Sequence, residues 1–152
     1  MPRKIICTVP EQVCSKDCIL ELEEALSASY IEALGATASP TILWCPLPAG
    51  QSYVAGSEDD VYIFLVEVQD GLEQSQREVV MMNIAKCASQ SFGIDIGKPL
   101  VSALDSSMVK EYLKGNRNRL KWHRRPGFLL GTLWHAIISK KQNGFSTMRA
   151  NL

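Results

Sequence analysis

The sequence lacks the features that would direct a protein to a membrane or to nucleic acid. Its sixteen basic and sixteen acidic side chains cancel, so the whole chain has no field that would attract nucleic acid or anionic lipid. Its longest apolar run, Phe128 to Ile138, is interrupted by Gly131 and His135 and falls short of the roughly 20 residues that span a bilayer. No apolar signal core stands at the N-terminus. We expect a globular cytoplasmic protein that binds neither membrane nor nucleic acid.

Metal ligands are scarce as well. The 152 residues include two histidines and five cysteines, and an odd number of cysteines favours reduced thiols over a disulfide framework. Cys14 and Cys18 have the spacing C-x3-C, but no second ligand pair follows them. A structural zinc needs four convergent ligands. We therefore expect neither a metal nor a cofactor.

Apolar residues are plentiful, at 46% of the chain, and they are arranged as a repeat. The first half begins with a β-type run over residues 2–9. Ser15 is a good N-cap for a helix, Gly35 predicts where that helix ends, and Pro40 precedes a second β-type run, Thr41 to Cys45. The apolar residues between Ser15 and Gly35 recur at helical spacing; they are Ile19, Leu22, Leu26 and Tyr30.

The same order returns 58 to 59 residues later, counted from Gly35 to Gly93 or from Pro40 to Pro99. The stretch VYIFLVEV, from Val61 to Val68, strongly predicts a strand. A helical pattern follows it and ends at Gly93, and Pro99 precedes a last β-type run, Leu100 to Leu104. The residues on one face of this second helix are Val80, Ile84, Cys87 and Ser91.

The repeat predicts an α+β fold made of two tandem β-α-β units, at about residues 2–46 and 61–104. A β-α-β crossover implies parallel pairing within each unit. The two units could then join into a four-stranded sheet with both helices on one face. The other face would be apolar and uncovered, which argues for association between copies.

Several features of this pattern resemble the tautomerase superfamily. They are the proline directly after Met1, the duplicated β-α-β unit of about sixty residues, and two short motifs, PLPAGQSYVAG (Pro46 to Gly56) and MVKEYLKG (Met108 to Gly115). The motifs are similar to those of cis-3-chloroacrylic acid dehalogenase and its relatives. The resemblance implies a tautomerase-like (MIF-like) domain over residues 1–117, a C-terminal extension over residues 118–152, and a homotrimer.

Pro2 has two possible roles. It could be an edge-strand proline, because proline has no N–H to donate to a sheet. Alternatively, removal of Met1 would expose a secondary amine with a pKa of about 8, which Arg3 and Lys4 would lower toward neutrality. The resemblance implies that this amine is the general base and acid. If Met1 is retained, Pro2 is an amide and cannot act in this way.

The other site residues follow from the resemblance position by position. A substrate-holding histidine of the dehalogenases aligns with Tyr30, and their paired arginines align with Asp70 and Glu73. Two acids would repel a carboxylate, so we do not expect haloacrylate dehalogenation. Their glutamate is retained as Glu111, and a later arginine is matched in charge by Lys114. The candidate catalytic residues are therefore Pro2, Glu111 and Tyr30, and the candidate substrate contacts are Lys114, Tyr112 and Arg117.

Some of these residues also have simpler interpretations. Tyr30 lies on the apolar face of its helix and could be a core residue, and Glu111 could be a surface glutamate. The stretch Lys110 to Arg125 contains seven basic residues and one acid; with its aromatic residues it could bind nucleic acid. We expect it instead to meet the acidic stretch Ser57 to Glu73 of a neighbouring subunit.

Two hypotheses for function remain. In the first, the protein is a tautomerase-like isomerase that uses Pro2 on a small keto or enol acid or a related unsaturated acid. In the second, it is a catalytically silent relative that serves as an oligomeric binding protein. Removal of Met1 is required by the first hypothesis and irrelevant to the second.

Overall fold

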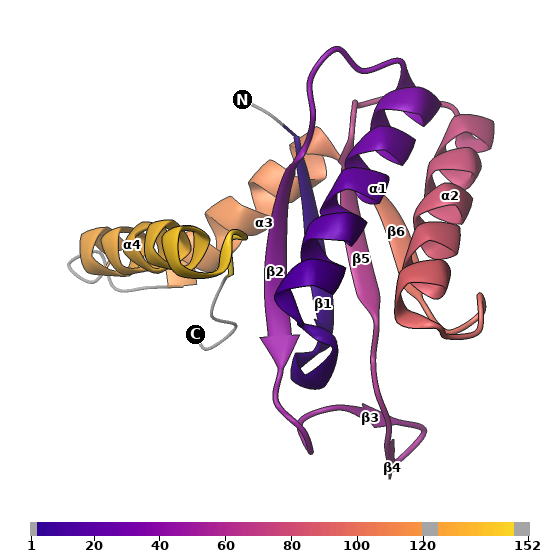
Figure 1. Ribbon diagram of the computed structural model, residues 1–152. Coiled ribbons are helices and arrows are strands. Elements are labelled where there is room, and N and C mark those ends of the chain that lie inside the picture. The colour runs from indigo at the N-terminus through magenta and orange to yellow at the C-terminus, as the bar shows by residue number, and fades with distance from the viewer. Residues whose placement is uncertain (1–2, 120–124, 148–152) are drawn as a thin grey trace.

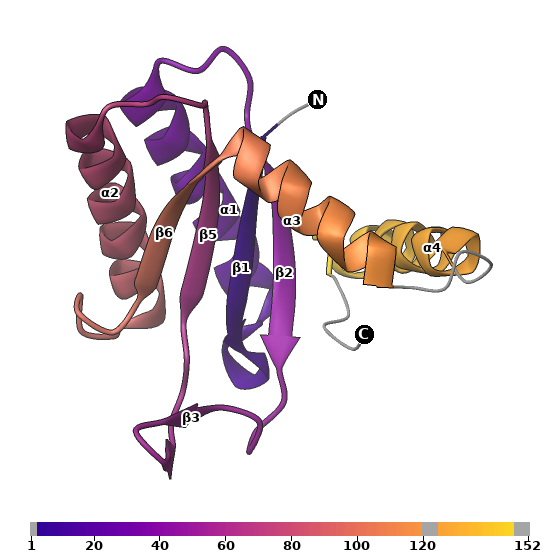
Figure 2. The same cartoon turned by 180° about the vertical axis from the view of Figure 1, so that it is seen from behind.

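The computed structural model describes residues 3–119 and 125–147, and its centre is a mixed four-stranded sheet (Figures 1 and 2). The strand order is β2-β1-β5-β6. Strand β1 is parallel to β2, and β5 is parallel to β6, whereas β1 and β5 are antiparallel. This arrangement confirms the prediction of two β-α-β units joined in one sheet. The strands are β1 (Lys4–Pro10), β2 (Thr41–Leu47), β5 (Ile63–Val68) and β6 (Leu100–Asp105).

One long helix connects the two strands of each unit. Helix α1 (Lys16–Leu34) and helix α2 (Gln74–Phe92) lie side by side on one face of the sheet (Figure 1). Ser15 is the N-cap of α1, as predicted, although its side chain makes no capping hydrogen bond. Gly35 and Gly93 end the two helices in the left-handed conformation, with φ angles of 57° and 64°. Glycine adopts this conformation without steric cost.

The core fills the space between the sheet and these two helices. Alternation along each strand sends every second side chain into this layer, and the first-half helix presents the four residues expected from its spacing. In the second half, Cys87 and Ser91 are only half-buried. Trp44 of β2 is fully buried, and its Nε1 donates a hydrogen bond to Glu23 of α1 at 2.9 Å. Other buried members are Ile5, Cys7, Val9, Ile19, Leu22, Leu26, Tyr30, Phe64, Val66, Val68, Val80 and Ile84.

The segment between the two units contains structure that the sequence did not predict. Strands β3 (Tyr53–Val54) and β4 (Ser57–Glu58) pair as a hairpin. Its two turn residues, Ala55 and Gly56, have φ angles of 51° and 85°, as a tight hairpin turn requires. Within the first unit, a short 3-10 helix, η1 (Glu11–Val13), follows β1 and was not predicted either. Elements this short leave no periodic pattern in a sequence.

The C-terminal part of the chain forms two helices, of which α3 (Ser106–Arg119) lies on the side of the sheet opposite α1 and α2 and runs across part of that face (Figure 2). Helix α3 follows β6 directly, and helix α4 (Arg125–Asn143) extends outward beyond β2 (Figure 2). After α4 the chain returns to the sheet: Phe145 is buried, Thr147 forms a parallel bridge with Trp44, and the Trp44 N–H donates to the Ser146 carbonyl at 3.0 Å. The boundary expected after residue 117 falls inside α3.

None of the helices in the described part of the chain is long and apolar enough to cross a membrane.

Candidate functional site at the start of β1

The start of β1 lies at the end of the sheet where β5 finishes. Ile5 pairs with Val66, which places Lys4 opposite Glu67. The Lys4 backbone N–H donates to the Glu67 carboxylate at 3.2 Å, and the Lys4 ammonium lies 3.6 Å from the same oxygen. The Glu67 side chain is 6% exposed, so Lys4 offsets a buried charge. Pro2, the principal predicted residue, lies outside the described residues.

Tyr30 approaches this position from the last turns of α1. Its hydroxyl donates a hydrogen bond to the backbone carbonyl of Glu67 at 2.8 Å, and the residue is 1% exposed. Burial raises the pKa of Tyr30, while the nearby charge of Arg3 opposes the rise. The structure thus brings Tyr30 to the start of β1, as a catalytic role requires. The hydroxyl is also hydrogen-bonded to the backbone, as in a core residue. Tyr30 can therefore still be either a catalytic or a core residue.

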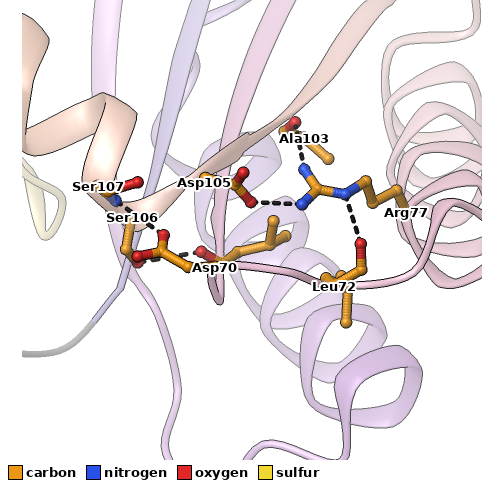
Figure 3. Close-up of polar contacts among 8 residues, drawn as sticks. Asp70, Leu72, Arg77, Ala103, Asp105, Ser106 and Ser107 are labelled. Atoms are coloured by element: carbon orange, nitrogen blue, oxygen red, sulfur yellow. Dashed lines mark hydrogen bonds and ion pairs between the residues drawn. The ribbon is translucent and has the colours of Figure 1, made fainter.

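Asp70 joins this end of the sheet to α3 (Figure 3). Its carboxylate accepts a hydrogen bond from the Ser107 backbone N–H at 2.9 Å and thereby caps the helix. This bond is the main reason that the pKa of Asp70 is lowered, and the charges of Lys110 and Arg3 add to it. Both cations therefore lie near Asp70. Glu73, the other acid aligned with the arginine pair, is the exposed N-cap of α2 and makes no side-chain capping bond.

Arg77 is a polar residue that the sequence reasoning missed. Its guanidinium donates to the carbonyls of Leu72 at 2.9 Å and Ala103 at 3.4 Å, and it forms an ion pair with Asp105 (Figure 3). These contacts tie the start of α2 to the end of β6 and use all three nitrogens of the guanidinium. The sequence did contain an indication of this role. Arg77 stands three residues before Val80 on the buried face of α2, and a charged side chain there needs polar partners.

The remaining predicted residues lie on α3, and Glu111, Tyr112 and Lys114 face solvent. Glu111 and Lys114, with Lys110, line a depression of about 500 Å³ on the helix surface. Tyr112 is 68% exposed. Arg117 belongs to α3, but its side chain lies outside the described residues. The structure therefore groups Glu111 with Lys114 and sets Tyr30 apart from them, inside the fold.

Several members of the acidic stretch Ser57 to Glu73 already have partners within the chain. Asp59 forms an ion pair with Lys98 at 3.0 Å, and Asp60 accepts a hydrogen bond from the Gln12 amide at 2.8 Å. The Lys98 hydrogen bond is the main cause that lowers the pKa of Asp59. These contacts lie at the other end of the sheet from the start of β1, so they leave the candidate site unaffected.

Among the described residues, no group of three or more histidine, cysteine, aspartate or glutamate side chains is arranged to hold a metal ion. All five cysteines are free thiols. Burial raises the pKa of Cys7 and Cys45, and raises that of Cys14 to about 11.

No protein-family model matches the chain, and no curated protein does. Solved structures match it clearly. One is Pt0534 inactivated by 2-oxo-3-pentynoate, which is 24% identical with a TM-score of 0.63 over 67% of this chain and 84% of that one. Another is a wild-type fused 4-OT solved as an asymmetric trimer, at 19% identity and TM-score 0.63 over 67% and 85%.

A third similar structure is a member of the cis-3-chloroacrylic acid dehalogenase family, 11% identical with a TM-score of 0.61 over 67% of this chain and 73% of that one. The chain has the tautomerase fold. This agrees with the resemblance found in the sequence.

Proposed function

We propose that the protein is a tautomerase-type enzyme whose catalytic group is the secondary amine of Pro2, exposed when Met1 is removed. The observation that carries the proposal is the anchoring of β1 at its first residue. The Lys4 backbone N–H is bound to the Glu67 carboxylate, so the sheet is anchored from the second residue after Pro2. The tautomerase fold and the proline after Met1 support the same assignment.

In this proposal the neutral amine of Pro2 takes a proton from a small keto or enol acid, or a related unsaturated acid, and returns it at a different atom. Of the two cations expected to lower the pKa of the amine, Lys4 is offset by Glu67, so Arg3 supplies the larger effect. Asp70 limits it in turn, since Arg3 lies near that carboxylate.

The roles of the other candidate residues are part of the same proposal. Tyr30 and Glu111 would assist proton movement, and Lys114, Tyr112 and Arg117 would contact the substrate. Haloacrylate dehalogenation is not part of the proposal, because Asp70 stands at the place of a substrate-gripping arginine and is committed to capping α3. We also propose a homotrimer: fused 4-OT proteins that share the fold have been solved as trimers, and large apolar side chains of β6 and α4 are exposed in the single chain.

A covalent probe and one variant test the catalytic proposal. We expect intact-mass measurement to show a chain without Met1, and 2-oxo-3-pentynoate, which inactivated Pt0534, to add once at Pro2. Ketonisation of phenylenolpyruvate, followed by absorbance, should be slow and should rise with pH, since only the neutral amine accepts the proton. Pro2→Ala should lose most of this activity.

A catalytically silent binding protein is the alternative. It is favoured by one observation, the structural use of Asp70 where the dehalogenases grip their substrate. Retention of Met1, or full activity in Pro2→Ala, would replace the enzyme proposal with this one.

A further inference from the structure

The neutral chain is divided into two strongly and oppositely charged parts. Residues 1–105, which contain the whole sheet and α1 and α2, have fifteen acidic and six basic side chains, a net charge of −9. Residues 106–152, which contain α3 and α4, have ten basic side chains and one acid, a net charge of +9. We call these parts the body and the tail. Each part is the electrostatic complement of the other part in a second copy.

The tail also exposes an apolar stripe along α4. Its four members are spaced i, i+3, i+4 and i+7, so they lie on one side of the helix. Each is between 60% and 67% exposed, and no described residue covers them. A monomer rarely leaves so many large apolar side chains in a row on its surface. The stripe consists of Leu130, Leu133, Trp134 and Ile137.

Helix α4 is held firmly where it meets the sheet, so the stripe has a fixed direction. The Thr147 N–H donates to the Ser139 hydroxyl at 2.9 Å, the Thr147 carbonyl lies 3.3 Å from the His135 ring nitrogen, and Phe145 is buried in the core. From this anchor at the β2 edge, α4 projects away from the body (Figures 1 and 2). The stripe is therefore out of reach of its own sheet.

The body has a matching surface at its opposite edge. Strand β6 is last in the order β2-β1-β5-β6 and has no strand beyond it among the described residues. Leu100 of β6 is 61% exposed. Alternation places Leu104 on the same face as Leu65 of β5 and Ile6 of β1; these three are half-buried, and α3 crosses part of this face (Figure 2). A helix emerging at one edge and an apolar surface at the other form a heterologous pair of surfaces, which can close into a ring.

We propose that the stripe of α4 docks at the β6 edge of the sheet of a second copy, where Leu100 is exposed, with the basic tail against the acidic body. A membrane or a nucleic acid is a poorer occupant, because the body, at −9, would be repelled by the phosphates that attract the tail. A second copy would pair the basic tail with the acidic body and would bury both the α4 stripe and the apolar residues at β6. The interface extends the proposed trimer and does not depend on the chemistry of Pro2.

Sedimentation velocity of the full chain, over a range of concentrations, tests the interface. The variant is Leu133→Ser with Trp134→Ser, and the matched control is Tyr53→Ser, which alters an equally exposed (65%) apolar residue on the distant hairpin. Because all three side chains are on the surface, we expect every variant to fold, as circular dichroism would show. The double variant should weaken association at least about tenfold, as central interface residues do, and the control by less than about twofold.

A charge variant and a cross-link locate the two surfaces. Lys140→Glu with Lys141→Glu should weaken association, and raised salt should weaken that of the wild type. A photoreactive benzoylphenylalanine at position 137, in a mixture of ¹⁴N and ¹⁵N chains, should cross-link to peptides containing β6 that carry the other isotope.

The opposite results are equally clear. A monomeric wild type, association unchanged in the double variant, or cross-links confined to one isotope would overturn the inference. So would flotation with phosphatidylserine vesicles that requires the stripe while association does not. Pro2→Ala should associate like the wild type, so that failure of the enzyme proposal and failure of this interface are told apart.

Discussion

Glu67 is the residue that decides the charge around the start of β1. Its buried carboxylate binds both the backbone and the ammonium of Lys4. Glu67→Gln can keep an acceptor for the backbone N–H but removes the negative charge. The Lys4 ammonium is then no longer offset, so in the proposed enzyme the protonated amine of Pro2 would become less favourable and its pKa would fall. We expect the rising limb of the pH–rate profile to move to lower pH.

Asp59→Asn is the matched control for that profile. Asp59 is also an acid paired with a lysine, Lys98, but it lies at the far end of the sheet. Its replacement should leave the profile in place. An unchanged profile in Glu67→Gln would show that the carboxylate has no electrostatic effect on catalysis.

Cys14 should be a slow nucleophile despite its partial exposure. Burial, and then the charges of Glu11 and Cys18, raise its pKa to about 11. At pH 8 only about one thiol in a thousand would be ionised, and the thiolate is the form that reacts. We expect iodoacetamide to modify Cys14 far more slowly in the folded protein than in urea, with the folded rate still rising above pH 9. Equal rates in the two states, measured by peptide mass spectrometry, would contradict this.

At the scale of elements, two glycine substitutions should have opposite effects on stability. Gly35 ends α1 with a positive φ and nothing near its missing Cβ, so Gly35→Ala costs only backbone strain, about 1 kcal/mol. Gly131 lies within α4 without a positive φ, and its Cβ position is also open. Gly131→Ala should therefore stabilise the helix by about 0.5–1 kcal/mol. Urea unfolding measures both, and changes of the same sign would contradict the assignment.

The sequence was sufficient to predict the elements whose causes are local. The helix ends at Gly35 and Gly93 and the strand at VYIFLVEV follow from residue type and periodicity, and the structure confirms them. The β3–β4 hairpin was missed because two-residue strands have no period. The return of Thr147 to Trp44 was missed because it joins residues about a hundred positions apart, which no local pattern encodes.

The candidate site was less predictable than the fold. Pro2 was predicted from its secondary amine together with the resemblance to a family, and a catalytic role for Tyr30 from the resemblance alone; both roles stay predictions. Asp70 was identified as a departure from that family, but its role in capping α3 depends on Ser107, which lies in a different element. Arg77 was overlooked because its partners, Ala103 and Asp105, come from a strand that is distant in the sequence.

At the scale of the whole molecule, the proposed trimer predicts a definite mass. Three chains of 16.8 kDa give about 50 kDa for a closed three-fold assembly. Light scattering of the native protein at micromolar concentration should give this value, because a monomer would leave Leu100 and the α4 stripe in water. A stable mass near that of one chain would contradict the trimer.

The bridge between Thr147 and Trp44 means that the β2 edge stays unpaired during much of the protein's synthesis. Domains generally begin to fold from the N-terminus while synthesis continues, and the strands, helix and apolar residues of the first β-α-β unit are all present early. The β2 edge, however, is paired by Ser146 and Thr147, which are translated about a hundred residues after it. Until they arrive, the nascent chain carries an open strand edge of the kind that joins wrongly with other chains. Ribosome-bound chains stalled before residue 144 should therefore be more prone to aggregation than the released protein.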